Sequence, residues 1–183
     1  MLTKKMIQTI NSQINKEIYS AYLYLAMAAS AEASGFKGAA GWLKVQYHEE
    51  MFHAIKFYEY LADQGAEIKL MAIAEPQMKF SSLLEIYQKT LAHEQTVTKS
   101  INNLMELAIA EKDHASQALL AWYVTEQVEE EKNATEILQT LKMIGNNTSA
   151  LFLYDKELGA RMVTIPTDFS KGLSAAAAAT AAG

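Results

Sequence analysis

The stretch LLAWYVTEQVEEEKNATEIL, residues 119–138, carries acidic and amide side chains on an apolar helical stripe. Its apolar residues recur at the three- and four-residue spacing of an amphipathic helix: Leu120, Tyr123, Ala134 and Ile137. Gln127 and Glu130 continue the same spacing, so they are predicted to point into the core. A carboxylate in a core is destabilising unless it is protonated, paired with a cation or bound to a metal. The stretch therefore predicts a helix whose buried face needs such compensation.

Three other long segments show the same spacing, and proline occurs only at Pro76 and Pro166. The predicted helices cover residues 4–33, 37–65, 82–110 and 113–145, with a short fifth helix over 149–158. Ser82 and Asp113 are the predicted caps of the third and fourth helices. The inner stripe of the first helix is predicted to run through Ile7, Ile10, Ile14, Ile18, Ala21 and Leu25.

Helices of this length would be roughly 40 to 45 Å long at 1.5 Å per residue, which favours a bundle. The irregular stretch 66–80 is too long for a tight turn, so it is predicted to be a crossover along the bundle. The expected fold is all-α, a four-helix bundle with one long crossover and a short fifth helix. Residues 1–160 form the predicted single domain, and residues 161–183 form an alanine-rich, flexible tail with no assigned function.

Charge and cysteine content exclude several classes of function. The 183-residue chain has a net charge of -5 and no long basic run, so we expect neither a nucleic-acid nor a membrane partner. It has no cysteine, which excludes disulfides, thiolate metal sites and cysteine nucleophiles. The first residues, MLTKKMIQTINSQINKE, contain no apolar run of signal-peptide length, which predicts a cytoplasmic protein.

Each predicted helix carries an inward polar group near its midpoint, and these groups repeat in a fixed register. Glu50 follows Glu17 by 33 positions, and Gln127 follows Glu94 by 33 positions. In each half of the chain a further polar group lies three residues later. Two helical hairpins would therefore bring six side chains to one level, namely Glu17, Glu50, His53, Glu94, Gln127 and Glu130.

Such a cluster requires positive charge, and no lysine or arginine falls at these inner positions. Several carboxylates in one core are compensated most simply by metal ions from solution. A set of carboxylates with one imidazole suits iron, manganese or zinc rather than a thiophilic metal. The pattern therefore predicts a metal centre inside a single subunit.

The chain resembles the bacterial non-haem ferritins over residues 1–158. The matching segments are KEIYSAYLYLAMA (16–28), QYHEEMFHAIKFYEYL (46–61), HEQTVTKSINNL (93–104) and LLAWYVTEQVEEEKNATEI (119–137). The resemblance implies a homo-oligomeric shell of 24 subunits that oxidises Fe(II) with O2 or H2O2 and stores ferric mineral. The resemblance thus implies a non-haem ferroxidase, whereas the 33-residue register by itself indicates only a metal centre.

The resemblance also implies roles for individual residues. One iron site matches Glu17, Glu50 and His53, and a second shares Glu50 as a bridge. The second site adds Glu94 and Glu130, with Gln127 near the oxidant. A third iron site matches Glu49, Glu126 and Glu129, with Glu130 shared. Tyr24 matches the tyrosine beside the dinuclear centre, where it would donate an electron or a hydrogen bond.

Two alternatives remain open at this stage. A haem-containing bacterioferritin would carry E-x-x-H in the fourth helix, whereas this chain has Gln127-Val128-Glu129-Glu130, so no haem is expected. Met51 stands where haem-binding relatives have their axial methionine, but core or interface packing is the preferred interpretation. A non-catalytic helical scaffold is the second alternative, and it predicts no iron-dependent oxygen consumption.

Overall fold

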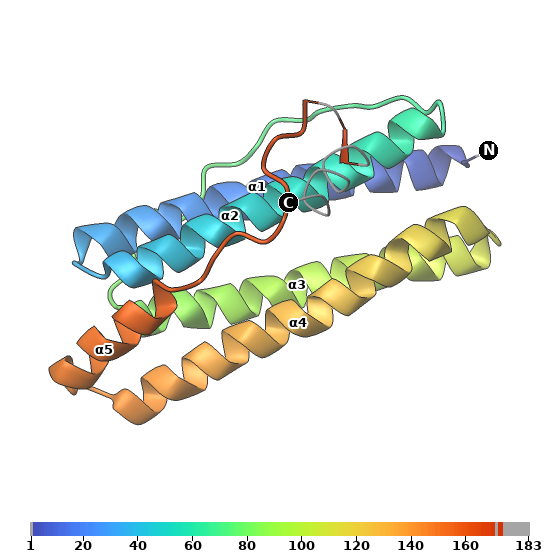
Figure 1. Cartoon of the computed structure of the whole chain (residues 1–183). Helices are drawn as coiled ribbons and strands as arrows, with labels where there is room; N and C mark the ends of the chain where they lie inside the picture. The colour runs from blue at the N-terminus through green and yellow to red at the C-terminus, as the bar shows by residue number, and fades with distance from the viewer. Residues whose placement is uncertain (1, 171, 174–183) are drawn as a thin grey trace. The chain divides into compact units, whose positions relative to one another are not determined.

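The computed structural model describes residues 2–170, 172 and 173, and this part of the chain contains five α-helices and no strand (Figure 1). The helices are α1 (Lys4–Ala33), α2 (Lys37–Asp63), α3 (Leu83–Ala110), α4 (His114–Ile144) and α5 (Thr148–Leu158). All predicted helices are present, with bounds within two residues of the expected ones. None of the helices in the described ranges is both long and apolar enough to cross a bilayer. The alanine-rich end of the predicted tail, residues 174–183, lies outside the described residues.

The chain divides into two compact units. Among the described residues, the α1–α2 unit comprises 10–79, 155–170, 172 and 173, and the α3–α4 unit comprises 2–9 and 80–154. In the first unit a short turn joins antiparallel α1 and α2, and Gly35 in that turn has a φ of +87°. In the second unit α3 and α4 are joined by residues 111–113, where Lys112 adopts a φ of 55°.

Both predicted helix caps are confirmed. The Ser82 hydroxyl accepts a hydrogen bond from the Glu85 N–H at 3.1 Å, and Asp113 Oδ1 accepts one from the Ser116 N–H at 3.0 Å. The Glu85 carboxylate reaches back to Ser81, accepting from its N–H and its hydroxyl, both at 2.6 Å. The starts of α3 and α4 are therefore fixed by local side chains, as the sequence indicates.

The long crossover is held along α1 by two asparagines. Asn11 Nδ2 donates to the carbonyl of Glu67 at 2.9 Å, and Asn11 Oδ1 accepts from the Lys69 N–H at 2.6 Å. Asn15 Nδ2 reaches the carbonyls of Met71 and Ala72 at 3.3 and 3.1 Å. The two side-chain amides form hydrogen bonds with backbone groups of the crossover that have no partner in a helix or strand. These bonds hold the irregular segment in one conformation along α1.

The start of α2 depends on a residue more than one hundred positions away. Its N-cap residue, Phe36, makes no side-chain capping bond. Asp155 supplies it instead, because its Oδ2 accepts from the Gly38 N–H at 3.0 Å and its Oδ1 accepts from the Ala39 N–H at 2.8 Å. A carboxylate at this position satisfies free N–H groups and also interacts favourably with the helix dipole.

One residue of the predicted inner stripe is wrongly placed. Ile10, Ile14 and Ala21 are buried as expected, and Ile7 and Ile18 are half-buried. Leu25 is 37% exposed, whereas its neighbour Tyr24 is fully buried. A period of 3.6 residues allows the inner face to continue at either the third or the fourth residue, so the spacing could not decide between them. Leu25 lies in an apolar hollow of about 370 Å³, lined by Ile18, Ala21, Tyr22, Leu25, Tyr47, Met51 and Ile73.

Candidate metal centre

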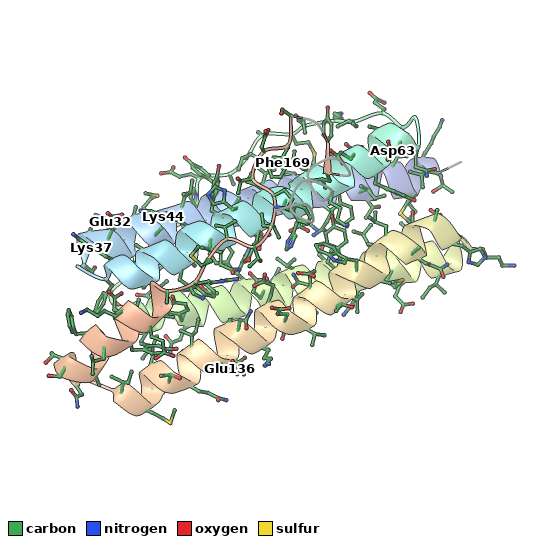
Figure 2. The ribbon with its side chains drawn as sticks, viewed as in Figure 1. Glu32, Lys37, Lys44, Asp63, Glu136 and Phe169 are labelled. Carbon is green, nitrogen blue, oxygen red and sulfur yellow. The ribbon has the colours of Figure 1, made fainter. Side chains whose placement is uncertain are left out.

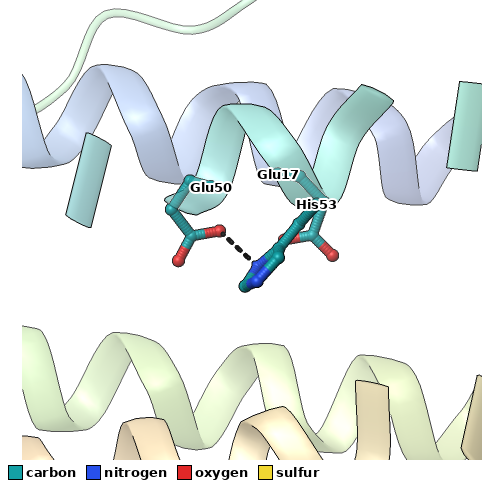
Figure 3. A group of neighbouring side chains, drawn as sticks. All are labelled: Glu17, Glu50 and His53. Atoms are coloured by element: carbon teal, nitrogen blue, oxygen red, sulfur yellow. Dashed lines mark ion pairs between the residues drawn. The ribbon is translucent and has the colours of Figure 1, made fainter. Parts of the chain in front are cut away.

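Three predicted ligands meet inside the α1–α2 unit. Glu17 comes from α1, and Glu50 and His53 lie one turn apart on α2 (Figure 3). One ligand atom from each residue lies within 4.8 Å of the others, and all three side chains are buried. Ile14 and Ala21, one turn to either side of Glu17, are also buried, so the apolar stripe determines the direction of this carboxylate.

A buried amide orients the first carboxylate. Gln13 Nε2 donates to Glu17 Oε1 at 2.8 Å, and the Gln13 side chain is only 1% exposed. Gln13 was not among the predicted site residues, although its position one helical turn before Glu17 is a usable signal. On α2, Glu50 Oε2 and His53 Nδ1 lie 3.5 Å apart.

Burial shifts the protonation of two of these groups. It raises the pKa of Glu17 above its ordinary value, while the Gln13 hydrogen bond and then Glu50 and Lys16 act in the opposite direction. Burial, with a smaller contribution from Lys56, lowers the pKa of His53 to about 4. His53 is therefore neutral at pH 7, and its contact with Glu50 is not a charged pair under that condition. A neutral imidazole beside two carboxyl groups is a donor set that binds a divalent metal well.

The lowered pKa of His53 has a consequence for acid stability. The unfolded chain takes up a proton on this histidine near pH 6.5, whereas the folded chain does so only near pH 4. The iron-free protein should therefore lose stability as pH falls through this window, by about 2 kcal/mol at pH 5 from this group. Glu17 acts with the opposite sign, because its raised pKa weakens the fold as pH rises above 4.5.

Urea unfolding of iron-free wild type and His53→Gln at pH 7 and pH 5 isolates the histidine contribution, since Glu17 is present in both. Wild type should lose more stability than the variant between the two pH values. Equal losses of unfolding free energy in the two proteins would show that protonation of His53 does not destabilise the fold in acid.

The remaining members of the predicted cluster are buried on the α3–α4 unit. Glu94 is 0% exposed, and Gln127 and Glu130 are 4% and 5% exposed. The Thr98 hydroxyl lies 2.9 Å from Gln127 Oε1 and 2.6 Å from Glu131 Oε1. Because one hydroxyl carries one proton, we infer that Thr98 donates to the Glu131 carboxylate and accepts from the Gln127 amide in its flipped orientation. Thr98 was missed from the sequence, although it lies one turn after Glu94.

The other predicted site residues occupy varied environments. Tyr24 is fully buried on α1, two turns after Glu17. Of the three residues assigned to a third iron site, Glu126 and Glu49 are half-buried and Glu129 is exposed. Glu49 Oε2 is also 2.6 Å from an Arg161 guanidinium nitrogen. Glu17, Glu50 and His53 remain the ligand group that the described part of the chain brings together.

A comparison with known families identifies the class of this chain. A family model described as a ferritin-like domain matches residues 7–144. The chain belongs to the ferritin family. Its ferritin relatives include the "Bacterial non-heme ferritin" of Staphylococcus aureus strain USA300, which is 41% identical over 161 residues, covering 88% of this chain and 97% of the relative. The protein of the same name from Staphylococcus saprophyticus is also 41% identical, covering 88% of this chain and 96% of that protein.

Solved ferritin structures confirm the fold class. An engineered closed form of the Archaeoglobus fulgidus ferritin is 44% identical, with a TM-score of 0.88 over 90% of this chain and 100% of that one. A structure described as a humanized archaeal ferritin gives 43% identity and a TM-score of 0.89, covering 90% of this chain and 99% of that chain. The chain therefore has the ferritin-like four-helix bundle with a long crossover and a short fifth helix.

Proposed function

We propose that this chain is an iron-storage protein with ferroxidase activity, which oxidises Fe(II) at a centre inside each subunit and deposits ferric mineral in a shell. The observation that carries the proposal is the buried group of Glu17, Glu50 and His53 in a chain of the ferritin family. Membership of that family and relatives named non-heme ferritins support iron storage in particular.

In the proposed mechanism iron is the substrate. The first Fe(II) binds Glu17, Glu50 and His53, and it displaces the proton that the raised pKa of Glu17 favours. The second Fe(II) binds Glu94 and Glu130 and shares Glu50. Two Fe(II) ions give two electrons to one O2 molecule, which with two protons yields H2O2 and two Fe(III) ions. Hard carboxylate ligands favour Fe(III) over Fe(II), so this ligand set drives the oxidation.

The second half of the centre is proposed to be the weaker one. Gln127 provides an uncharged amide where a carboxylate would bind more firmly, and Thr98 holds that amide in place. Asymmetry of this kind suits an ion that is passed onward after oxidation rather than a permanent cofactor. Tyr24, fully buried near Glu17 on the same helix, is proposed to supply an electron or a hydrogen bond to the centre.

We also propose self-association into a homo-oligomer, with 24 subunits as the expected number. The apolar hollow around Leu25, Tyr22 and Met51 supports it, because a contiguous apolar surface favours contact with another chain. Met51, for which core or interface packing is expected, is one of the residues that line this hollow. Electron microscopy of the purified protein would establish the number of subunits and the symmetry.

Aerobic addition of Fe(II) to the iron-free protein tests the central proposal. We expect absorbance of ferric species to rise faster than in buffer, oxygen to be consumed, and iron to elute with the protein on size exclusion. A non-catalytic helical scaffold would oxidise and retain no more iron than buffer or an unrelated acidic protein. That outcome would remove the proposed function.

A further inference from the structure

Arg161, just beyond the end of α5, extends its guanidinium onto one face of α2. It donates one hydrogen bond to Gln46 Oε1 and another, 2.6 Å long, to Glu49 Oε2. Its central carbon lies over the Trp42 ring, 4.5 Å from the ring centroid. We call Arg161 and its three partners on α2, Trp42, Gln46 and Glu49, the Arg161 clamp.

The clamp is largely shielded from water. The Arg161 and Glu49 side chains are 21% and 13% exposed, while Gln46 is fully buried and Trp42 is 5% exposed. A charge-assisted bond in such surroundings is less screened than a surface ion pair, and stacking on tryptophan adds to it. Lys44 and Glu32, by comparison, form a pair with both side chains about half exposed. The Arg161–Glu49 contact is therefore a stronger constraint than an ordinary surface pair.

The chain that follows Arg161 runs along the same helix. Figure 1 shows this segment beside α2, and Figure 2 labels Phe169 within it. Farther along, the Leu173 N–H faces both oxygens of the Glu59 carboxylate, at 3.0 and 3.1 Å. The segment that follows α5 is thus attached to α2 at Arg161 and at Leu173, and the first attachment is the clamp.

We propose that Arg161 is a tethered cation that occupies Glu49 Oε2, so that an iron ion binds this oxygen only by displacing the guanidinium. This inference rests on the proposed function and on the third iron site that the family resemblance implies, for which Glu49 is one of the matching residues. A directly bound metal lies about 2 Å from a carboxylate oxygen, and a guanidinium at hydrogen-bond distance from the same oxygen would repel it. Occupation of the third site by iron is thereby coupled to release of the segment from α2.

Displacement breaks a charge-assisted hydrogen bond and the contact with Trp42. The loss is expected to weaken binding of the third ion on the order of tenfold or more. The first two ions do not use Glu49, so their affinities should not depend on Arg161.

Anaerobic titration calorimetry with Fe(II) tests the inference on the iron-free, full-length protein. Three proteins are compared: wild type, Arg161→Gln, and Lys156→Gln, which removes the same charge from an exposed position on α5. The last binding step should be at least about tenfold tighter in Arg161→Gln and unchanged in Lys156→Gln. An unchanged last step in Arg161→Gln, or an equal gain in Lys156→Gln, would overturn the inference.

The same titration separates this inference from the proposed function. If the two tighter steps are absent from all three proteins, the proposed function fails; if they are present but Arg161→Gln matches wild type, only the clamp inference fails. Hydrogen exchange in wild type gives a measurement that does not depend on the variant folding. Exchange in residues 160–170 should accelerate when the third equivalent of Fe(II) binds, and unchanged exchange would contradict the coupling.

Discussion

Glu50→Gln should slow aerobic Fe(II) oxidation by at least about a hundredfold. Loss of a residue that only supports a ligand typically costs 10–100-fold in metal affinity or activity, and Glu50 is proposed to bind both ions directly. Glutamine keeps the volume of the side chain but removes its negative charge, so the two cations would lose their shared anion. Initial rates from the absorbance of ferric species, at a fixed ratio of iron to subunit, measure the effect.

The matched control is Glu136→Gln, which makes the same chemical change on α4 at a side chain that is 62% exposed (Figure 2). Its rate should equal that of wild type. Glu50→Gln should also unfold in urea no more easily than iron-free wild type, because it removes a carboxylate from a buried position. A normal rate in Glu50→Gln would refute a bridging role for Glu50, and a large loss of stability would attribute a slow rate to misfolding.

Gly38→Ala should lower the free energy of unfolding by about 3 kcal/mol or more, beyond the usual cost of overpacking. A Cβ atom on Gly38 would lie 1.6 Å from the carbonyl oxygen of Asp155 and 3.0 Å from the Gly159 nitrogen. Backbone atoms cannot move aside as a flexible side chain can, so the chain around Asp155 must leave the start of α2. That movement also removes the two capping bonds from the Asp155 carboxylate.

Gly41→Ala provides a control on the same helix. A Cβ at this position meets nothing within 4 Å, so alanine should raise stability by about 0.5–1 kcal/mol through its better helix propensity. Thermal melting is a sufficient measurement, since 1 kcal/mol corresponds to roughly 2–4 °C for a chain of this size. Equal melting temperatures for the two variants would show that the close approach at Gly38 does not constrain the fold.

The helices of this protein and many residues of its candidate site can be predicted from the amino-acid sequence. Helical spacing and local caps such as Ser82 and Asp113 depend on residues a few positions apart, so they can be read along the chain. The inward direction of Glu17 and Glu94 follows from the same periodicity, and both are buried. Helical spacing did not predict which of Tyr24 and Leu25 is the more buried, because it permits either residue to face inward.

Contacts between residues far apart in the sequence become visible only in the folded chain. Asp155 caps α2 and Arg161 binds Glu49 across more than one hundred residues, and neither contact follows from a spacing or a motif. The pKa of His53 likewise depends on how completely the packed chain removes water from it. Local patterns specify the direction of a side chain on its own helix, whereas its partners and its solvation depend on segments that only folding brings close.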